Sequence, residues 1–232
     1  MAPELYEKKD GRGKTRIQPY VWICLGIIVA FLIAVYCGGK AAISGRTLHI
    51  LTGPLDAKIP FVPEWIAVYC SAYLVWVISA LWLFSEDRSN AYRLTAGVVL
   101  AFLLSGIVFV AWPGTLQRPE ISGDGVFQKW VRLIYSADTP TNLCPSFHVM
   151  LSYYCWRGMA CSRRTPGWAH WCSFFYLILV CVSVLLVKQH ALVDIPAAVL
   201  IGELSFRAAD RWQFEKILYW IEKTLKGSIK GT

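Results

Sequence analysis

The sequence has few charged residues and no closely spaced cysteine pair. Only 16% of its 232 residues are charged, whereas 56% are hydrophobic and the mean hydropathy is +0.47. A soluble domain is nearer half apolar and seldom has a positive mean hydropathy, so the composition argues against a soluble globular fold. The eight cysteines include no CxxC motif, which argues against a zinc or redox site and against a disulfide framework. Most of them lie in apolar runs, where cysteine acts as a small hydrophobic residue.

The sequence contains long apolar runs that have no charged residue. A helix needs about 17–25 apolar residues to cross about 30 Å of hydrocarbon. The uncharged runs of that length are Val21–Cys37, Trp65–Phe84, Leu94–Trp112 and Trp171–Val187. Two further stretches of sufficient length, Cys144–Cys161 and His190–Phe206, contain ionisable residues. The sequence therefore predicts an all-α, polytopic membrane helix bundle of about six transmembrane helices, forming a single domain over residues 1–232.

The distribution of positive charge predicts which side of the membrane the two ends face. If the helices alternate in direction, most of the 23 lysines and arginines fall on the side that holds both termini. Cytoplasmic loops carry such an excess, so both termini are expected in the cytoplasm. Residues 1–20 are then a basic cytoplasmic N-terminus. The apolar run after it is longer than that of a signal peptide, so we expect it to be retained as the first helix.

Residues 208–232 are expected to form a cytoplasmic amphipathic tail. Its apolar residues at helical spacing are Phe214, Ile217, Leu218, Ile221 and Leu225. The residues assigned to the opposite, polar face are Lys216, Glu222, Lys223 and Lys226. Such a helix either lies on the inner membrane surface or extends the last transmembrane helix. The net charge of +8 is explained by this bias and by anionic lipid headgroups rather than by nucleic acid, because no basic patch is interleaved with stacking aromatic residues.

Three polar clusters fall at the outer ends of the expected helices. The first contains Arg118, the second is the segment Pro145–His148, and the third runs from Lys188 through His190 to Asp194. Because the helices alternate in direction, all three clusters are expected at the extracytoplasmic face. Ionisable residues at a membrane boundary are costly, so three clusters at one face indicate a functional site.

The third cluster pairs a histidine with a carboxylate. His190 and Asp194 are four residues apart, which on a helix places them on one face, about one turn apart. A carboxylate there fixes the imidazole tautomer and prepares the histidine as a nucleophile or base. The alternative is a histidine at a helix start that only pairs with Asp194. A metal held by the two histidines and Asp194 is disfavoured, because Arg118 and Lys188 would repel the ion.

The second cluster suits an anion. Pro145 is expected in the first turn of a helix, and free amides at a helix N-terminus attract anions. Ser146 adds a hydroxyl, and His148 lies about one turn into the same helix. Arg118 and Lys188 supply the positive charge that a phosphate dianion requires. The alternative is a simple helix cap followed by an isolated polar residue, with two ordinary interfacial cations.

The order and spacing of the three clusters resemble the type 2 phosphatidic acid phosphatase superfamily. The motifs of that superfamily read KxxxxxxRP, PSGH and SRxxxxxHxxxD. This chain has RP at 118–119, PSFH at 145–148 and HALVD at 190–194. It departs from the pattern at three positions, where Ala111 replaces the lysine, Phe147 the glycine and Val184 the arginine.

The resemblance implies an integral membrane lipid phosphatase that works without a metal or other cofactor. His190 would attack phosphorus to form a phosphohistidine, Asp194 would orient His190, and His148 would protonate the leaving alcohol. The residues implied to bind the phosphate oxygens are Arg118, Ser146 and Lys188. The substrate would be phosphatidate, phosphatidylglycerol phosphate or a polyprenyl diphosphate, reached from the outer face of a cell membrane, with a bacterial plasma membrane expected.

Two other classes of function stay open. A lipid phosphotransferase of the inositolphosphoryl- or sphingolipid-synthase type would use the same histidines, with an alcohol in place of water. A transporter or non-catalytic scaffold also carries polar residues in its helices, but transport sites sit near mid-membrane, often within inverted repeats. The partners expected from the sequence are the lipid phosphate and membrane lipids, and the oligomeric state is left open.

Two features outside the clusters carry structural expectations. Arg157 and Glu203 fall at similar depths, so they are expected to pair or to be bridged by a polar neighbour, with Glu203–Arg207 as the competing pair. We assign these residues to stability. The segment 53–64 has three prolines and cannot form one regular helix. It is either an interfacial element near a substrate entrance or a plain loop.

Overall fold

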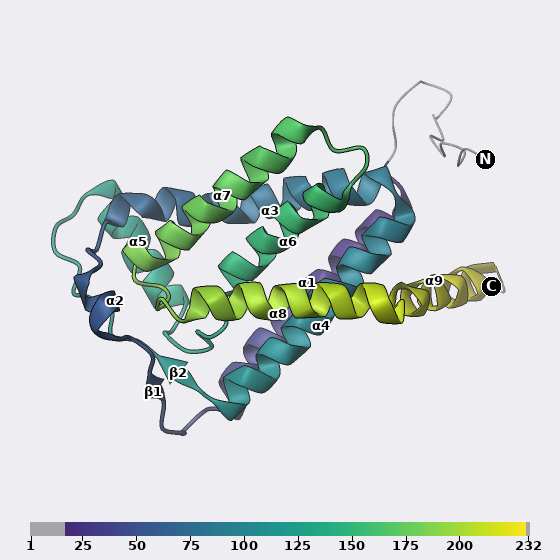
Figure 1. Ribbon diagram of the computed structural model, residues 1–232. Helices are drawn as coiled ribbons and strands as arrows, with labels where there is room; N and C mark the ends of the chain where they lie inside the picture. The colour runs from purple at the N-terminus through teal and green to yellow at the C-terminus, as the bar shows by residue number, and fades with distance from the viewer. Residues whose placement is uncertain (1–16, 231–232) are drawn as a thin grey trace.

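The computed structural model describes residues 17–230, with side chains to residue 224. Within these residues the regular secondary structure is helical except for two short paired strands, and loops join these elements (Figure 1). The helices are α1 (Pro19–Ala42), α2 (Pro54–Lys58), η1 (Pro63–Trp65), α3 (Ile66–Glu86), α4 (Arg88–Ala111), α5 (Val126–Ala137), α6 (Phe147–Cys161), α7 (Gly167–Leu186), α8 (Asp194–Trp212) and α9 (Glu215–Lys230). The strands are β1 (His49–Ile50) and β2 (Gly114–Thr115), which pair in parallel.

Four helices have the length and apolar composition to cross a membrane. They are α1, the continuous unit Pro63–Glu86 made of η1 and α3, α4, and α7. These helices cover the four uncharged runs apart from the last residue of two of them, Trp112 and Val187. The prediction is therefore confirmed as far as a mainly helical chain with four candidate membrane-spanning helices. The two charged stretches also form helices, α6 and α8, which pack against α7 and α4 (Figure 1). In an apolar medium a helix satisfies its own backbone hydrogen bonds, which explains why uncharged runs fold this way.

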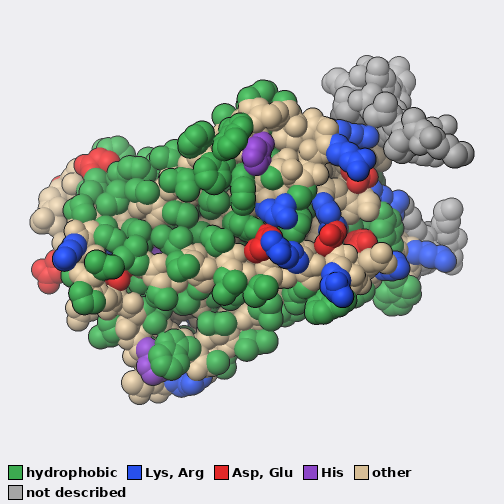
Figure 2. All heavy atoms as spheres, viewed as in Figure 1, with side chains coloured by type: hydrophobic (Ala, Val, Ile, Leu, Met, Phe, Trp, Pro, Cys, Tyr) green, Lys and Arg blue, Asp and Glu red, His purple; other side chains and the backbone are tan. Residues whose placement is uncertain are grey.

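The interior and the outer surface are both apolar. α4 packs against α1 and α8, while α6 packs against α3, α7 and α8. Small residues allow these helices to approach closely, and Gly202 of α8 is one example, because a Cβ added there would lie 3.0 Å from the Tyr153 ring of α6. Figure 2 shows hydrophobic side chains over most of one face, with charged side chains gathered toward the end where α9 lies. The exposed apolar side chains include Leu74, Ile107 and Phe175, as expected for a surface that faces lipid.

One charged residue of α6 and two of α8 form a connected group. Arg157 Nε lies 3.1 Å from Glu203 Oε2, which confirms the first predicted pair. Arg207 Nε lies 2.5 Å from the other carboxylate oxygen of Glu203, so the competing pair forms as well. The Tyr153 hydroxyl also donates to Glu203. A single carboxylate therefore has three donors, which is how a charge is accommodated among apolar helices.

Replacing Glu203 with glutamine is expected to lower the free energy of unfolding by roughly 1–3 kcal/mol, because Arg157 would lose its carboxylate among apolar helices. Thermal unfolding in detergent measures the effect. The matched control is Asp210→Asn, which breaks the 3.0 Å ion pair between Asp210 and Arg93. The Asp210 side chain is 56% exposed. Exposed pairs contribute at most about 1 kcal/mol, so equal losses in the two variants would contradict this assignment.

The C-terminal helix differs in part from the sequence expectation. α8 ends at Trp212, and the left-handed conformation of the next residue, Gln213 (φ 52°), separates it from α9, so α9 is not an unbroken extension of α8. Glu222 was assigned to the polar face but is buried, because it pairs with Arg88 and accepts from the Tyr92 hydroxyl of α4. Trp220 is 66% exposed on the other side. Residues 1–16 of the predicted basic N-terminus, and the side chains of 225–232 of the tail, lie outside the described part of the chain.

Candidate active site

Three of the predicted residues line one cavity. Arg118, Lys188 and His190 surround a space of about 350 Å³ between the loop after α4 and the turn between α7 and α8. The segment that includes Thr52, Gly53, Asp56, Ala57 and Ile59 forms another wall of this cavity. β1 and β2 join these two loops, because residues 49–50 pair with residues 114–115. The structure thus brings the first and third clusters together.

His190 and Asp194 form the predicted pair. The imidazole Nδ1 lies 3.0 Å from Asp194 Oδ2, and the Asp194 side chain is completely buried. The same carboxylate oxygen accepts from the Ala191 backbone N–H at 2.9 Å. An ionised carboxylate only accepts hydrogen bonds, so Nδ1 carries a proton, and in the neutral imidazole Nε2 keeps its lone pair. This arrangement leaves one imidazole nitrogen available as a nucleophile.

The expectation that His190 and Asp194 lie on one face of a helix is wrong. α8 begins at Asp194, and His190 lies in the turn before it. The backbone N–H groups of Gln189 and His190 both donate to the Val184 carbonyl, at 3.0 and 3.1 Å, and Lys188 has a φ of 51°. The turn therefore belongs to the C-terminal end of α7, where unpaired carbonyls accept such bonds. The turn, rather than a shared helix face, directs His190 toward Asp194.

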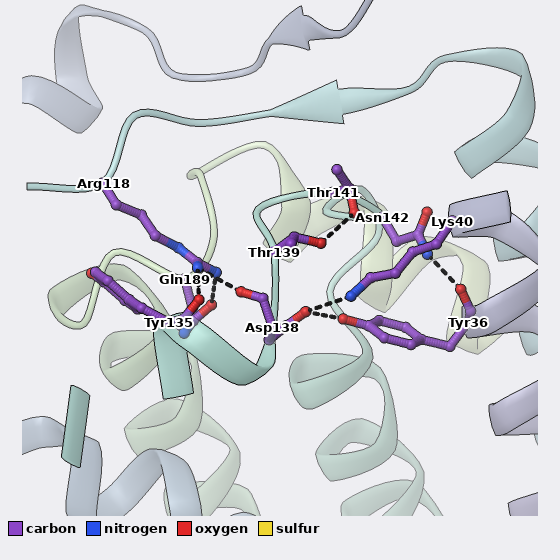
Figure 3. Close-up of polar contacts among 9 residues, drawn as sticks. All are labelled: Tyr36, Lys40, Arg118, Tyr135, Asp138, Thr139, Thr141, Asn142 and Gln189. Carbon is purple, nitrogen blue, oxygen red and sulfur yellow. Dashed lines mark hydrogen bonds and ion pairs between the residues drawn. The ribbon is translucent and has the colours of Figure 1, made fainter. Parts of the chain in front are cut away.

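Arg118 is held by neutral acceptors (Figure 3). Its Nη1 donates to the carbonyl of Asp138 at 2.6 Å and to that of Tyr135 at 3.3 Å, and its Nη2 donates to Gln189 Oε1 at 2.6 Å. The guanidinium also lies 4.3 Å from the centre of the Tyr135 ring. Burial lowers the pKa of Arg118, and the Asp138 carboxylate opposes that shift. None of these direct partners neutralises the cation, so its charge can act on an anion in the cavity.

Lys188 is also held by neutral acceptors. Its Nζ donates to the carbonyls of Asp56 at 3.0 Å and Ile59 at 2.6 Å. Burial lowers the pKa of Lys188, and Asp56 opposes that shift. Val184, which stands where the third motif of the resembled superfamily has an arginine, is a completely buried residue of α7. Lys188 is therefore a cation that reaches the cavity from the same turn as His190.

Ser146 caps α6 and does not line the cavity. Its side chain is fully buried and accepts from the Val149 N–H at 3.4 Å. Pro145 precedes this cap, so its predicted place in the first helical turn is wrong, because the Ser146 cap sets the start of the helix one residue later. The Ser146 backbone N–H donates to the Asp194 carbonyl at 3.4 Å. This bond places the start of α6 beside the start of α8.

His148 lies under aromatic rings. Its imidazole stacks on Tyr69 with 3.9 Å between ring centres, and Trp76 and Tyr73 approach at 5.0 and 5.2 Å. It is 7% exposed, and its Nε2 has no hydrogen-bond partner among the described residues. It is also close enough to His190 for the two imidazoles to interact electrostatically. The next residue back, Phe147, points elsewhere and packs against Phe102 and Phe109 of α4.

Several residues around the site escaped the sequence analysis. Tyr69, Tyr73 and Trp76 recur at helical spacing on α3, and that spacing is a signal of a shared aromatic face. Asp138 joins α1 to the loop after α5, because its carboxylate accepts from the Tyr36 hydroxyl and from Lys40 at 3.2 Å (Figure 3). Asp56 and Gln189 gave no sequence signal, since their partners are distant in the chain.

No group of three or more His, Cys, Asp or Glu residues is arranged to hold a metal ion within the described part of the chain. A comparison of the chain with models of known protein families gives no match, and neither does a comparison with curated proteins. The functional interpretation therefore rests on the three motifs and on the geometry of this cavity.

Proposed function

We propose that the protein is an integral membrane phosphatase of lipid phosphates. One observation carries the proposal. His190, with Nδ1 bonded to the buried Asp194, lines the same cavity as Arg118 and Lys188. A histidine nucleophile beside two cations whose direct hydrogen-bond partners are neutral suits attack on a phosphate, because these cations offset the negative charge that opposes the attack.

The chemistry takes two steps. In the first, Nε2 of His190 forms a bond to phosphorus while the bond from phosphorus to the lipid oxygen breaks, and His148 gives that oxygen a proton. In the second, water attacks phosphorus, His148 takes the proton from that water, and the bond from phosphorus to nitrogen breaks. The products are inorganic phosphate and the lipid alcohol, or the lipid monophosphate where the substrate is a diphosphate. Asp194 stabilises the positive charge that develops on His190 in the first step.

The cations and the cap have supporting roles in this proposal. Arg118 and Lys188 bind the non-bridging oxygens, where charge is concentrated throughout both steps. Ser146 caps α6 from a buried position outside the cavity, so in this proposal it supports the site by holding the start of α6 beside the start of α8. Fixed cations take the part that a metal ion takes in other phosphatases, so the proposed reaction needs no metal or other cofactor.

We further infer how the protein sits in a membrane. α6 has 15 residues and α8 has 19, and at about 1.5 Å per residue they extend about 22 and 28 Å. Together with the four apolar helices they would complete six crossings, with both termini cytoplasmic and the cavity at the extracytoplasmic side. The lipid tails would lie between helices, and the headgroup would enter from the interface.

A lipid phosphotransferase is the second candidate, and the surroundings of His148 favour it. The imidazole that would activate the acceptor is only 7% exposed and lies against Tyr69, Tyr73 and Trp76. Aromatic rings exclude water and accommodate the apolar body of an alcohol. An acceptor lipid would then take the phosphoryl group from His190 in place of water.

Release of free phosphate distinguishes the candidates. The purified protein would be given phosphatidate, phosphatidylglycerol phosphate and a polyprenyl diphosphate in mixed micelles, with and without diacylglycerol or ceramide as acceptor. The phosphatase predicts phosphate release that needs no acceptor. Transfer to the acceptor without phosphate release would support the transferase. Neither reaction with any substrate, together with no incorporation of label from radioactive lipid phosphate, would overturn both.

A further inference from the structure

The segment that contains α2 is tied to the turn that carries His190. Asp56 Oδ1 accepts from the Leu192 backbone N–H at 2.7 Å, and these residues are 136 positions apart. The Asp56 carbonyl and the Ile59 carbonyl both accept from Lys188 Nζ. Just beyond, the Val62 N–H donates to the Leu186 carbonyl at 2.9 Å. These bonds flank His190 in the sequence on both sides.

The Asp56 carboxylate is itself fixed. Its second oxygen, Oδ2, accepts from the Gly53 N–H at 2.9 Å, which closes the first turn of α2. A carboxylate with donors on both oxygens has little freedom to rotate. Asp56 also lines the cavity beside His190 and Lys188. The segment is therefore a rigid wall of the cavity rather than the plain loop that its three prolines also allowed.

We propose that Asp56 is a positioning residue that holds the turn from Lys188 to Leu192, and with it the imidazole of His190 and the ammonium of Lys188, against the cavity. The proposal rests on the phosphatase or phosphotransferase function proposed for that cavity. Asp56 acts through the turn and takes no part in bond making. Reactive groups that shift by about 1 Å can lose about 10²-fold in rate, so the fixed turn has a catalytic consequence.

Asp56 also acts on the charge of Lys188. Burial lowers the pKa of Lys188, and the Asp56 carboxylate raises it. Among the described residues, the other charged or titratable groups around this position include Arg118 and His190, which line the cavity, and Asp194, which is paired with His190. Tyr135 is also near, because its hydroxyl donates to the neighbouring Val187 carbonyl. Removing the Asp56 charge lowers the pKa of Lys188 further, so the ammonium loses its proton at a lower pH. Activity that depends on this cation then falls at a lower pH on the alkaline side.

Two substitutions separate position from charge. Asp56→Asn keeps an amide oxygen for the Leu192 N–H but removes the charge and the acceptor of the Gly53 N–H, whereas Asp56→Ala removes the charge and both acceptors. The matched controls are Asp124→Asn and Asp124→Ala, since Asp124 is 89% exposed in another loop and pairs only with Arg132 among the contacts recorded for it. Phosphate release, or transfer, from phosphatidate in mixed micelles gives kcat, KM and the pH profile of each variant.

The expected result is a kcat for Asp56→Ala that is about 10- to 100-fold below that of Asp124→Ala, with a smaller loss for Asp56→Asn. The alkaline limb should move to lower pH in both Asp56 variants and stay in place in both controls. A purely structural helix cap would lower thermal stability and leave that limb in place. Values of kcat within threefold of the controls, or an unmoved limb, would overturn the proposal.

A second readout does not depend on activity. Acylation of the Lys188 amine, followed by mass spectrometry across a pH series, measures its titration in the wild type and in each variant. The titration should shift to lower pH in the Asp56 variants alone. If the wild type neither releases nor transfers phosphate, the proposed function fails, and this titration still decides whether Asp56 controls Lys188. An unchanged titration refutes that control.

Discussion

Replacing His190 with alanine is expected to reduce phosphate release by about 10³- to 10⁶-fold, as deletion of a nucleophile does in other enzymes. The reason is that, without the His190 imidazole, no nitrogen atom can accept the phosphoryl group before water attacks it. The measurement is free phosphate from the best substrate of the lipid panel. Acid-labile label on the protein after brief mixing with radioactive substrate should disappear in parallel, because phosphohistidine hydrolyses in acid.

Two further variants make this result interpretable. His190→Gln can still donate a hydrogen bond to the buried Asp194 carboxylate, so it tests the nucleophile if the alanine variant fails to fold. His49→Ala is the matched control, because His49 is exposed and stacks on Trp112 at 4.2 Å, away from the cavity residues. Full activity in a folded His190 variant would contradict the phosphatase and the phosphotransferase alike, and would favour a transporter or scaffold.

Replacing Arg118 with lysine is expected to lower kcat/KM by about 10²- to 10³-fold, although the charge is unchanged. The guanidinium reaches the carbonyls of Tyr135 and Asp138 and the amide of Gln189 at once. An ammonium group on a flexible stem cannot reproduce that planar set of donors. The cation would therefore be less well placed when charge develops on the phosphate oxygens. Steady-state kinetics with the same substrate measures the loss.

The matched control for this substitution is Arg132→Lys. Arg132 also donates to two backbone carbonyls, those of Ile121 and Gly123, and to the Asp124 carboxylate, but it does not line the cavity. It should retain activity within about twofold, since it makes no contact with the site. Equal losses in the two variants would show that the arginine at 118 has only a structural part.

The pairing of His190 with Asp194 was predictable in part. Their spacing correctly indicated contact, but the reason was wrong, because a turn at the end of α7 brings them together instead of a helix. The expectation depended only on separation along the chain, and both a helix and a tight turn bring residues four apart close together. The local sequence therefore indicated that His190 and Asp194 are in contact, but not whether the backbone between them is a helix or a turn.

The contacts of Asp56, Asp138 and Gln189 could not be predicted in this way. Asp56 bonds to Leu192 across 136 positions, Lys40 to Asp138 across 98, and Arg118 to Gln189 across 71. Nothing in the neighbourhood of each residue distinguishes it from an ordinary polar residue of a loop. These contacts exist only because the helices pack in one particular arrangement.

The sequence by itself determined the four long apolar helices, whose length and composition suit a membrane. Uncharged runs of that length must satisfy their own backbone hydrogen bonds in lipid, so they become helices whatever their neighbours are. It also indicated which ionisable residues would carry a free-energy cost at a membrane boundary and are therefore candidates for a functional site. The tertiary structure decided which of them meet. Arg118, Lys188 and His190 share a cavity, whereas Ser146 caps α6 and His148 lies beneath aromatic rings of α3. Side chains from separate helices come together through packing, and packing depends on the whole chain at once.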